Sequence, residues 1–301
     1  MISLIIQEHN EGRTFVQKML EQAAKLPMQK EVIYVTSTSL TKFQKDYGPF
    51  DYGYPVQIID NIQSCGEARN RGGNAARGDT LLYMDSHVCF KPDMVDRLLQ
   101  TLNQHQNAIV APAIQAIEFP SCEISGGLGH GVYFRFNKIP FEWVWEPALQ
   151  TREEFKTPFV CGCAFSIKKN VFNILTRYGG FLSGHTGLSW EEEKSMRLWR
   201  LGYPTYIEPR ATFGHLYKGY ANHPKWDDHS TSGYYETRIA GFYVNVFNKD
   251  LWNHIEKMLI NSWGNEYYKY LEKAKKDYTW LRNAMQPYAN TIDENWFLRK
   301  T

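Results

Sequence analysis

Asp85, Ser86 and His87 form a short polar triplet directly after the apolar run Thr80–Met84. Two side chains that are two residues apart in an extended segment point the same way, so this carboxylate and this imidazole can share one cation. Mg²⁺ or Mn²⁺ held there would offset the charge of a diphosphate leaving group. As a bare pattern Asp-x-His is more typical of a surface loop than of a metal site, so the surrounding sequence has to decide.

The chain around the triplet alternates short apolar runs with stretches of helical periodicity. Such alternation predicts an α/β fold with a largely parallel sheet and helices on both faces. We expect strands at Ile2–Gln7, Glu31–Val35, Val56–Ile59, Thr80–Met84, Ala108–Ala111, Val160–Ile167 and Pro204–Ile207. We expect helices at Thr14–Leu26, Pro92–Leu102 and Glu191–Leu201, and one that contains Asn70–Ala76.

A second polar group follows the first expected strand. In sheets of this kind ligands bind beyond the carboxyl ends of the strands. His9, Asn10 and Glu11 fall at such an end, as the triplet at 85–87 does. We therefore expect both groups to line one site.

Composition excludes several classes of protein. The 301 residues carry a formal net charge of +2, which indicates no general affinity for polyanions. Aromatic residues make up 15%, and such side chains stack on sugars and bases. The short apolar start is followed by Glu8, and no segment is long enough to span a bilayer. An odd count of five cysteines argues against a secreted disulfide scaffold, so we expect a cytoplasmic protein without a membrane partner.

The chain changes character after about Lys218, which predicts a core at 1–218 and a helical C-terminal extension at 219–301. We expect helices at Asp250–Leu259 and Glu266–Asn283. The second interleaves tyrosines with lysines, a pattern that favours contact with nucleic acid. It is equally typical of a helix that packs its aromatic side chains on the core and leaves its lysines in solvent.

Several segments together resemble the polypeptide N-acetylgalactosaminyltransferases. Residues 66–87 read GEARNRGGNAARGDTLLYMDSH, which is similar to the stretch of that family that leads into its metal-binding Asp-Ser-His. His9-Asn10-Glu11 resembles the family's His-Asn-Glu after its first strand. The resemblance continues at Lys156-Thr157-Pro158, at the small-residue strand 161–165 and at Phe213-Gly214-His215-Leu216-Tyr217, and it spans about 2–218.

This resemblance implies a GT-A fold and transfer of a sugar from a UDP-sugar to a hydroxyl group, with Mn²⁺ or Mg²⁺ as cofactor. By position, Asp85, His87 and His215 would hold the cation. The residues expected at the nucleotide are His9, Asn10, Glu11, Thr36, Arg69, Arg71 and Ser86. Either arginine would contact phosphate, and an exposed helical position is the alternative for at least one of them.

Two segments depart from the family pattern. Val35-Thr36-Ser37-Thr38 has hydroxyl groups where many GT-A enzymes carry a nucleotide-binding Asp. The family's Trp-Gly-Gly-Glu-Asn is replaced by residues 187–193, GLSWEEE. We take Trp190, Glu191 and Glu192 as candidate catalytic residues there, although acidic residues at a helix start also favour the helix dipole.

Donor sugar, stereochemistry and acceptor stay open. The resemblance implies retention of anomeric configuration, with GalNAc, GlcNAc or a hexose as the donor sugar. The acceptor would be Ser/Thr of a polypeptide or a hydroxymethylated base in phage-type DNA. The alternatives are an inverting enzyme acting on a glycan or small molecule, in which Glu191 or Glu192 acts as base, an inactive sugar-binding relative, and a nucleotidyltransferase. The oligomeric state is not defined by any pattern.

Overall fold

The computed structural model describes residues 1–9, 11–129, 132–135, 142–145, 153–182, 190–217, 231–294 and 298–299. The first part alternates strands and helices. Its elements are β1 (Ile2–Glu8), α1 (Arg13–Ala24), β2 (Lys30–Thr36), α2 (Leu40–Tyr47), β3 (Val56–Ile59), α3 (Cys65–Ala75), β4 (Thr80–Asp85), β5 (Val88–Cys89) and α4 (Pro92–Gln104).

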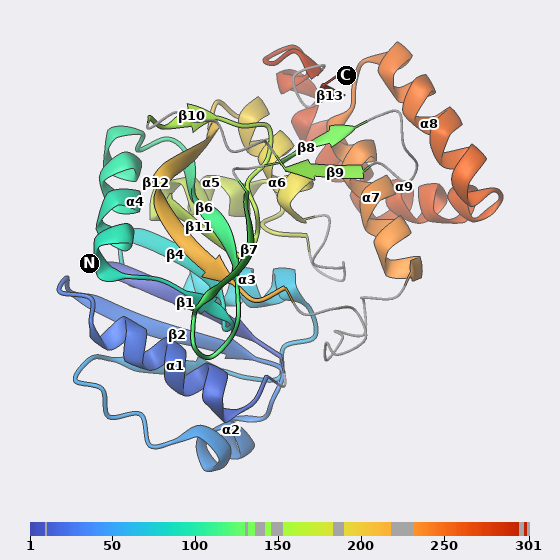
Figure 1. The fold of residues 1–301 in the computed structure, drawn as a ribbon. Coiled ribbons are helices and arrows are strands. Elements are labelled where there is room, and N and C mark those ends of the chain that lie inside the picture. The colour runs from blue at the N-terminus through green and yellow to red at the C-terminus, as the bar shows by residue number, and fades with distance from the viewer. Residues whose placement is uncertain are drawn as a thin grey trace.

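The middle part completes the sheet, and the last part is mainly helical (Figure 1). The middle elements are β6 (Ile109–Ile117), β7 (Ile124–Gly129), β8 (Val132–Arg135), β9 (Glu142–Trp145), β10 (Phe155–Lys156), β11 (Ala164–Lys168), α5 (Lys169–Arg177), α6 (Trp190–Arg200) and β12 (Thr205–His215). The last are α7 (Thr231–Asn245), α8 (Lys249–Trp263), α9 (Glu266–Met285), a 3₁₀ turn (Gln286–Tyr288) and β13 (Leu298–Arg299).

The main sheet has the order β10-β12-β6-β11-β4-β1-β2-β3, with β5 paired to β12 and β7 to β6. Neighbouring pairs among β4, β1, β2 and β3 are parallel, and so are β12 and β6. β11 runs antiparallel to both β4 and β6. The expected α/β sheet is thus confirmed; β5, β7 and β10 are antiparallel additions to it, and β11 is a reversed strand between β4 and β6 that hydrophobic patterning does not reveal. β8, β9 and β13 form a separate small sheet.

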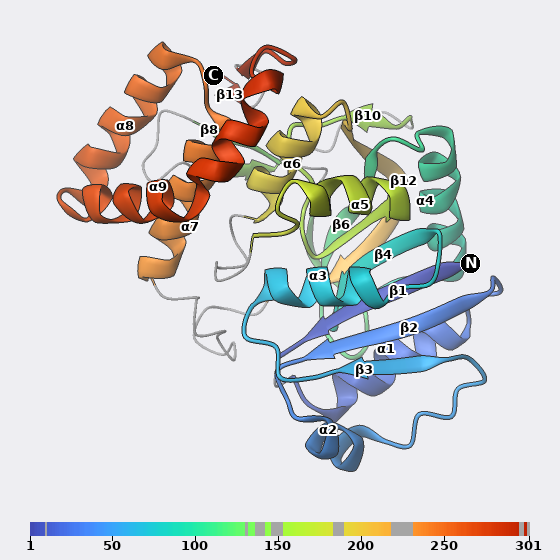
Figure 2. The same cartoon turned by 180° about the vertical axis from the view of Figure 1, so that it is seen from behind.

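Helices cover both faces of the main sheet (Figures 1 and 2). One core cluster joins side chains of α1 and α4 to one face, and a second joins α3 and α5 to the other. Consecutive residues of β1 divide between them: Leu4 and Ile6 lie in the first cluster and Ile5 in the second. Burial on both faces explains why this strand is a continuous apolar run.

Two glycines let α3 lie close to the sheet. A Cβ at Gly72 would lie 2.4 Å from Cγ2 of Ile5, and one at Gly73 would lie 2.4 Å from the Tyr83 hydroxyl. The helix begins after Ser64, whose hydroxyl accepts a hydrogen bond from the backbone N–H of Glu67. This close approach brings the first two turns of α3 to the carboxyl edge of the sheet.

The C-terminal helices pack on α6 and share a core with it. Tyr267 and Tyr270 of α9 are 0% and 6% exposed, and their cluster includes Phe159 and Met196 from the earlier part of the chain. The lysines of α9 that have ion-pair partners pair with glutamates: Lys269 with Glu266, Lys273 with Glu236 and Lys275 with Glu272. This arrangement favours the packing interpretation of the helix over a nucleic-acid surface. The domain boundary at 218/219 lies outside the described residues and stays a prediction.

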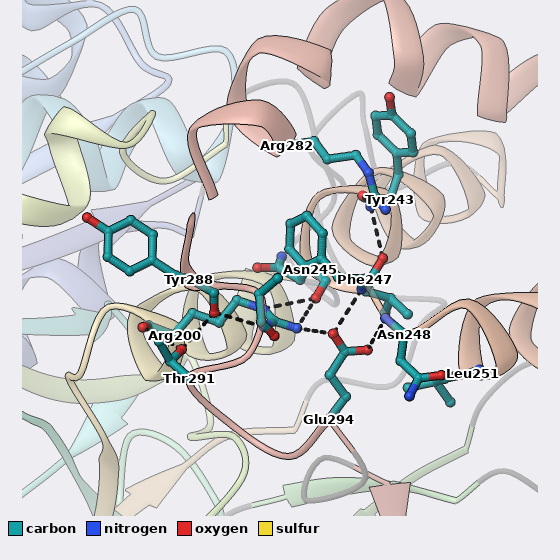
Figure 3. Close-up of polar contacts among 12 residues, drawn as sticks. Arg200, Tyr243, Asn245, Phe247, Asn248, Leu251, Arg282, Tyr288, Thr291 and Glu294 are labelled. Carbon is teal, nitrogen blue, oxygen red and sulfur yellow. Dashed lines mark hydrogen bonds and ion pairs between the residues drawn. The ribbon is translucent and has the colours of Figure 1, made fainter. Parts of the chain in front are cut away.

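A buried polar cluster joins α6, α7, α8 and the C-terminal segment (Figure 3). The side chain of Arg200, 0% exposed, forms an ion pair with Glu294 and donates to the carbonyl of Asn245 at 3.0 Å. Glu294 also accepts from the backbone N–H groups of Phe247 at 2.9 Å and Asn248 at 3.1 Å, at the start of α8. One arginine and one glutamate therefore bind the end of α7 and the beginning of α8.

Arg282 of α9 completes this cluster. Its guanidinium donates to the carbonyl of Val246 at 2.9 Å and lies 4.5 Å from the centroid of the Phe247 ring. The Arg200 guanidinium lies 4.9 Å from the same centroid. Two cations thus contact one aromatic ring, which adds cation–π attraction to the hydrogen bonds.

The structure contains a disulfide bond between Cys89 of β5 and Cys122 of the loop between β6 and β7, with Cα atoms 5.9 Å apart. Cys65, Cys161 and Cys163 are free thiols and buried. A single bond is no disulfide scaffold, but the odd cysteine count did not indicate it. Among the described helices, none combines the length and apolar character needed to cross a bilayer.

We expect Glu294→Ala to lower the free energy of unfolding by about 3–5 kcal/mol, because it leaves the buried Arg200 guanidinium without its counter-charge. Urea denaturation followed by circular dichroism measures this. The control is Glu272→Ala, which removes an exposed pair with Lys275 and should cost less than about 1 kcal/mol. Equal losses in the two variants would contradict the role given to the buried cluster.

Candidate metal centre

Asp85, His87 and His215 lie together at the carboxyl edge of the sheet, as the sequence predicts. Asp85 ends β4 and His215 ends β12, and β11 and β6 lie between these strands. β5 bridges the distance: it follows His87 directly and pairs with β12, with Val88 opposite His215. The candidate ligand atoms of the three side chains all lie within 4.8 Å of one another.

The separations of these atoms suit a small divalent cation. Nε2 of His87 lies 3.0 Å from Nε2 of His215. Oδ2 of Asp85 lies 3.4 Å from His215 Nε2 and 3.8 Å from His87 Nε2. Ligand atoms about 2.1 Å from one ion and about 90–130° apart are separated by about 3.0–3.8 Å. One carboxylate and two imidazoles are also ligands that Mn²⁺ accepts, so the residues present fit a cation.

Glu11 determines which nitrogen of His87 faces the site. Its two carboxylate oxygens lie 2.8 and 2.9 Å from His87 Nδ1. A carboxylate only accepts, so the ring proton sits on Nδ1 and Nε2 keeps its lone pair toward His215 and Asp85. A carboxylate behind a ligating histidine is a common support of metal sites. Glu11, expected at the nucleotide, thus contacts a metal-ligand candidate.

Charge at the centre favours an ionised aspartate and a neutral histidine. Burial by itself raises the pKa of Asp85, but the hydrogen bond with His215 and the nearby charges of His87, His215 and Arg69 lower it to about 2. Burial lowers the pKa of His215 despite its contact with Asp85. Both shifts favour the forms that bind a cation, a carboxylate and an uncharged imidazole.

Glu8, which the sequence patterns did not single out, binds the backbone of Glu11. Glu8 is 1% exposed, and its carboxylate accepts from the Thr36 hydroxyl and from the backbone N–H of Glu11 at 2.7 Å. Thr36 is fully buried, and its oxygen also accepts from the N–H of Thr38 at 2.9 Å. The sequence signal for this role was an acidic residue at the end of the first apolar strand. The nucleotide role of Thr36 stays a prediction.

His9 lies at the end of β1, where its Nδ1 is 2.7 Å from the Ser37 hydroxyl. His9 and the hydroxyl-rich segment after β2 therefore share the carboxyl edge of the sheet, the region expected to bind the nucleotide. Ser86 is fully buried, and its hydroxyl has no hydrogen-bond partner among the described residues. Its role at the nucleotide also stays a prediction.

The two arginines of α3 differ. Arg69 is 3% exposed and donates to the carbonyl of Gly162 at 3.0 Å, so it lies beneath the centre with its charge near Asp85. Arg71 is exposed on the helix surface and pairs with Glu67 at 3.3 Å, which is the alternative expected for one of the two.

The positions of the remaining candidate side chains are not described. Asn10 lies outside the described residues. Trp190, Glu191 and Glu192 form the first turn of α6, but their side chains are not among those described. Their assignment as catalytic residues stays a prediction.

Comparison with known proteins gives relatives among the polypeptide N-acetylgalactosaminyltransferases. Polypeptide N-acetylgalactosaminyltransferase 11 of Xenopus tropicalis is 24% identical over 263 residues, which cover 82% of this chain and 43% of the relative. Polypeptide N-acetylgalactosaminyltransferase 16 of Homo sapiens is 26% identical over 236 residues, which cover 72% of this chain and 40% of the relative. The chain thus spans less than half the length of these relatives.

Solved structures with the same fold include GalNAc-T7 determined with UDP, GalNAc and Mn²⁺. The TM-score is 0.71 at 18% identity, over 97% of this chain and 58% of that chain. The mannosyltransferase PcManGT from Pyrobaculum calidifontis, determined with GDP-Man and Mn²⁺, has a TM-score of 0.50 at 12% identity, over 96% of this chain and 73% of that chain. The fold of the chain is therefore GT-A.

The family model "Glycosyl transferase family 2" matches residues 3–175, from the second residue of β1 to α5. This match covers more than half of the chain and includes Glu11, Asp85 and His87, which makes the chain a member of glycosyltransferase family 2.

Proposed function

We propose that this protein is a metal-dependent glycosyltransferase that moves a sugar from a UDP-sugar to a Ser/Thr hydroxyl of a polypeptide. The observation that carries the proposal is the convergence of Asp85, His87 and His215 at the carboxyl edge of the sheet, with Glu11 behind His87. A divalent cation bound there neutralises the diphosphate of the leaving group.

The donor is proposed to be a UDP-sugar because the solved relative GalNAc-T7 was determined with UDP, GalNAc and Mn²⁺. We propose that His9 and Ser37, which lie in contact just beyond the ends of β1 and β2, contact the uracil or ribose. N-acetylgalactosamine is the first sugar to test, since the curated relatives are named for it.

A polypeptide acceptor is proposed because these relatives are polypeptide glycosyltransferases by name. The alternative DNA acceptor depended on free cations along α9, and Lys273 and Lys275 there form ion pairs with Glu236 and Glu272. A glutamate beside a lysine weakens its attraction for a phosphate, so Lys273 and Lys275 give less support to a DNA acceptor than the sequence pattern alone suggests.

Retention of anomeric configuration is proposed for the transfer. The acceptor hydroxyl attacks the face that the diphosphate leaves, and a leaving-group oxygen takes its proton. The protein then contributes positioning and charge stabilisation. Inversion would require a carboxylate base near the acceptor, and Glu191 and Glu192 are the candidates for that alternative.

The cytoplasmic setting expected from the sequence has no support in the structure. Disulfide bonds are rare in reducing compartments, so the bond between Cys89 and Cys122 weighs against this setting.

We expect Asp85→Ala and His87→Ala to abolish nearly all Mn²⁺-dependent hydrolysis of UDP-GalNAc measured without acceptor, since each removes a cation ligand. His215→Ala should lose at least about tenfold. The control is His254→Ala, which changes an exposed histidine on α8 and should keep the wild-type rate. Full turnover of the wild type in excess EDTA would contradict the proposal.

We expect Glu11→Ala to raise the Kd for Mn²⁺ by about 10–100-fold, because His87 loses the group that keeps its proton on Nδ1. Glu11→Gln should be milder, since the amide oxygen still accepts this hydrogen bond. Isothermal titration with Mn²⁺ measures both. Equal Mn²⁺ affinity in the wild type and the alanine variant would show that Glu11 does not support the centre.

The acceptor is tested by incubation with UDP-GalNAc and Mn²⁺ against a Ser/Thr peptide library and against hydroxymethylated DNA, with mass spectrometry as the readout. We expect glycosylated peptides and unmodified DNA. A Lys273→Gln, Lys275→Gln, Lys276→Gln triple variant should leave the peptide reaction unchanged. Modified DNA from the wild type, lost in this variant, would reverse the assignment.

A further inference from the structure

We propose that Gln7 is a positioning residue for the metal centre: its side-chain amide engages one oxygen of Asp85, so that Asp85 offers a cation only its other oxygen. The inference rests on the proposed metal-dependent function and deepens it. It gives Gln7 and its neighbour Cys65 a role that neither the sequence motifs nor the family match assigns.

The backbone of the sheet brings Gln7 and Asp85 side by side. β1 and β4 are parallel neighbours, and these two residues are paired in their register. The N–H of Ser86 donates to the Gln7 carbonyl at 3.1 Å. Paired residues on adjacent strands project to the same face of a sheet, so the two side chains emerge together at its carboxyl edge.

The side-chain contacts define the orientation of the Gln7 amide. Its Nε2 donates to Oδ1 of Asp85, and its Oε1 accepts from the Cys65 thiol, with Sγ 3.0 Å away. The ionised carboxylate of Asp85 only accepts hydrogen bonds, so a flipped amide would put two acceptors against each other. Cys65, the first residue of α3, supplies the donor that completes this orientation.

The two oxygens of Asp85 are therefore not equivalent. Oδ1 is engaged by Gln7, whereas Oδ2 lies 3.4 Å from His215 Nε2 and 3.8 Å from His87 Nε2. A small octahedral cation takes one oxygen per carboxylate at about 2.0–2.1 Å, whereas Ca²⁺ accepts both oxygens at about 2.3–2.6 Å. Because the hydrogen bond from Gln7 occupies Oδ1, Asp85 can bind a cation through only one oxygen. This arrangement favours small octahedral cations such as Mn²⁺ over Ca²⁺.

The test measures Mn²⁺ affinity by electron paramagnetic resonance, with Ca²⁺ as competitor and no sugar donor present. Gln7→Met keeps the length of the side chain but loses the amide donor. We expect it to raise the Kd for Mn²⁺ about tenfold. We also expect Ca²⁺ to displace Mn²⁺ at a lower ratio of concentrations than in the wild type, because Oδ1 becomes available. A merely structural role for Gln7 would not change this ratio.

Two variants of Cys65 and one control variant test the same role even where Gln7→Met does not fold. Cys65→Ser retains a donor to Gln7 and should behave as the wild type, whereas Cys65→Val removes it and should shift cation preference in the direction of Gln7→Met. The control is Gln115→Met, which removes another inter-strand glutamine, one whose amide donates to Gly126. Its Mn²⁺ affinity should be that of the wild type.

Unchanged Mn²⁺ affinity in Gln7→Met, or equal weakening of Mn²⁺ and Ca²⁺, would overturn the role of Gln7 while leaving the metal centre itself intact. Should Gln7→Met fail to fold, Cys65→Val decides between these outcomes. Absence of Mn²⁺ binding by the wild type, with Asp85→Asn indistinguishable from it, would instead reject the proposed metal-dependent function together with this inference.

Discussion

The pairing of β5 with β12 is the constraint on which the candidate site depends. Asp85 and His215 end strands that are separated in the sheet by two others, so their side chains would stay apart in a regular sheet. The chain turns at Ser86 and His87, and β5 then runs antiparallel to the last residues of β12. The polar supports described around the centre lie on or next to β1, β2 and α3, and they reach the same edge because β4, β1 and β2 are parallel neighbours. The Cys89–Cys122 bond ties the crossing strand to the β6–β7 loop.

Buried charged residues also connect α6 to the C-terminal segment. α6 carries Glu193, Arg197 and Arg200 on buried positions, and Glu193 pairs with Arg197 at 2.7 Å. Burial raises the pKa of Glu193 even though Arg197 opposes the shift. Such pairs stabilise little compared with apolar packing, but they penalise any arrangement that separates the partners. The Arg200–Glu294 pair joins α6 to the C-terminal segment, so it disfavours other orientations of that segment on the helix that contains Glu191 and Glu192.

Periodicity and motif spacing predicted the elements that build the site. Apolar runs that are buried on both faces marked β1, β2 and β4, and the order of motifs identified Asp85, His87 and His215. Other features escaped: the direction of β11, the short strands β5, β7–β10 and β13, the helices α2, α5 and α7, the Cys89–Cys122 bond, and the supporting contacts of Glu8 and Glu11. Strand direction depends on the loops that connect strands, and supporting contacts depend on which strands are neighbours. Neither is encoded in local spacing, so only the assembled sheet reveals them.

The reversed direction of β11 has an evolutionary consequence. β6 ends at Ile117 on the carboxyl edge, and β11 begins at Ala164 on that same edge, because it runs the opposite way. The segment between β6 and β11 therefore starts and ends at the edge of the sheet that carries the candidate metal centre. Insertions, deletions and recombination within it alter what surrounds the centre while the register of the central strands stays untouched. The reversal of β11 thus lets one connecting segment change in length without altering the register of the strands that carry the candidate ligands.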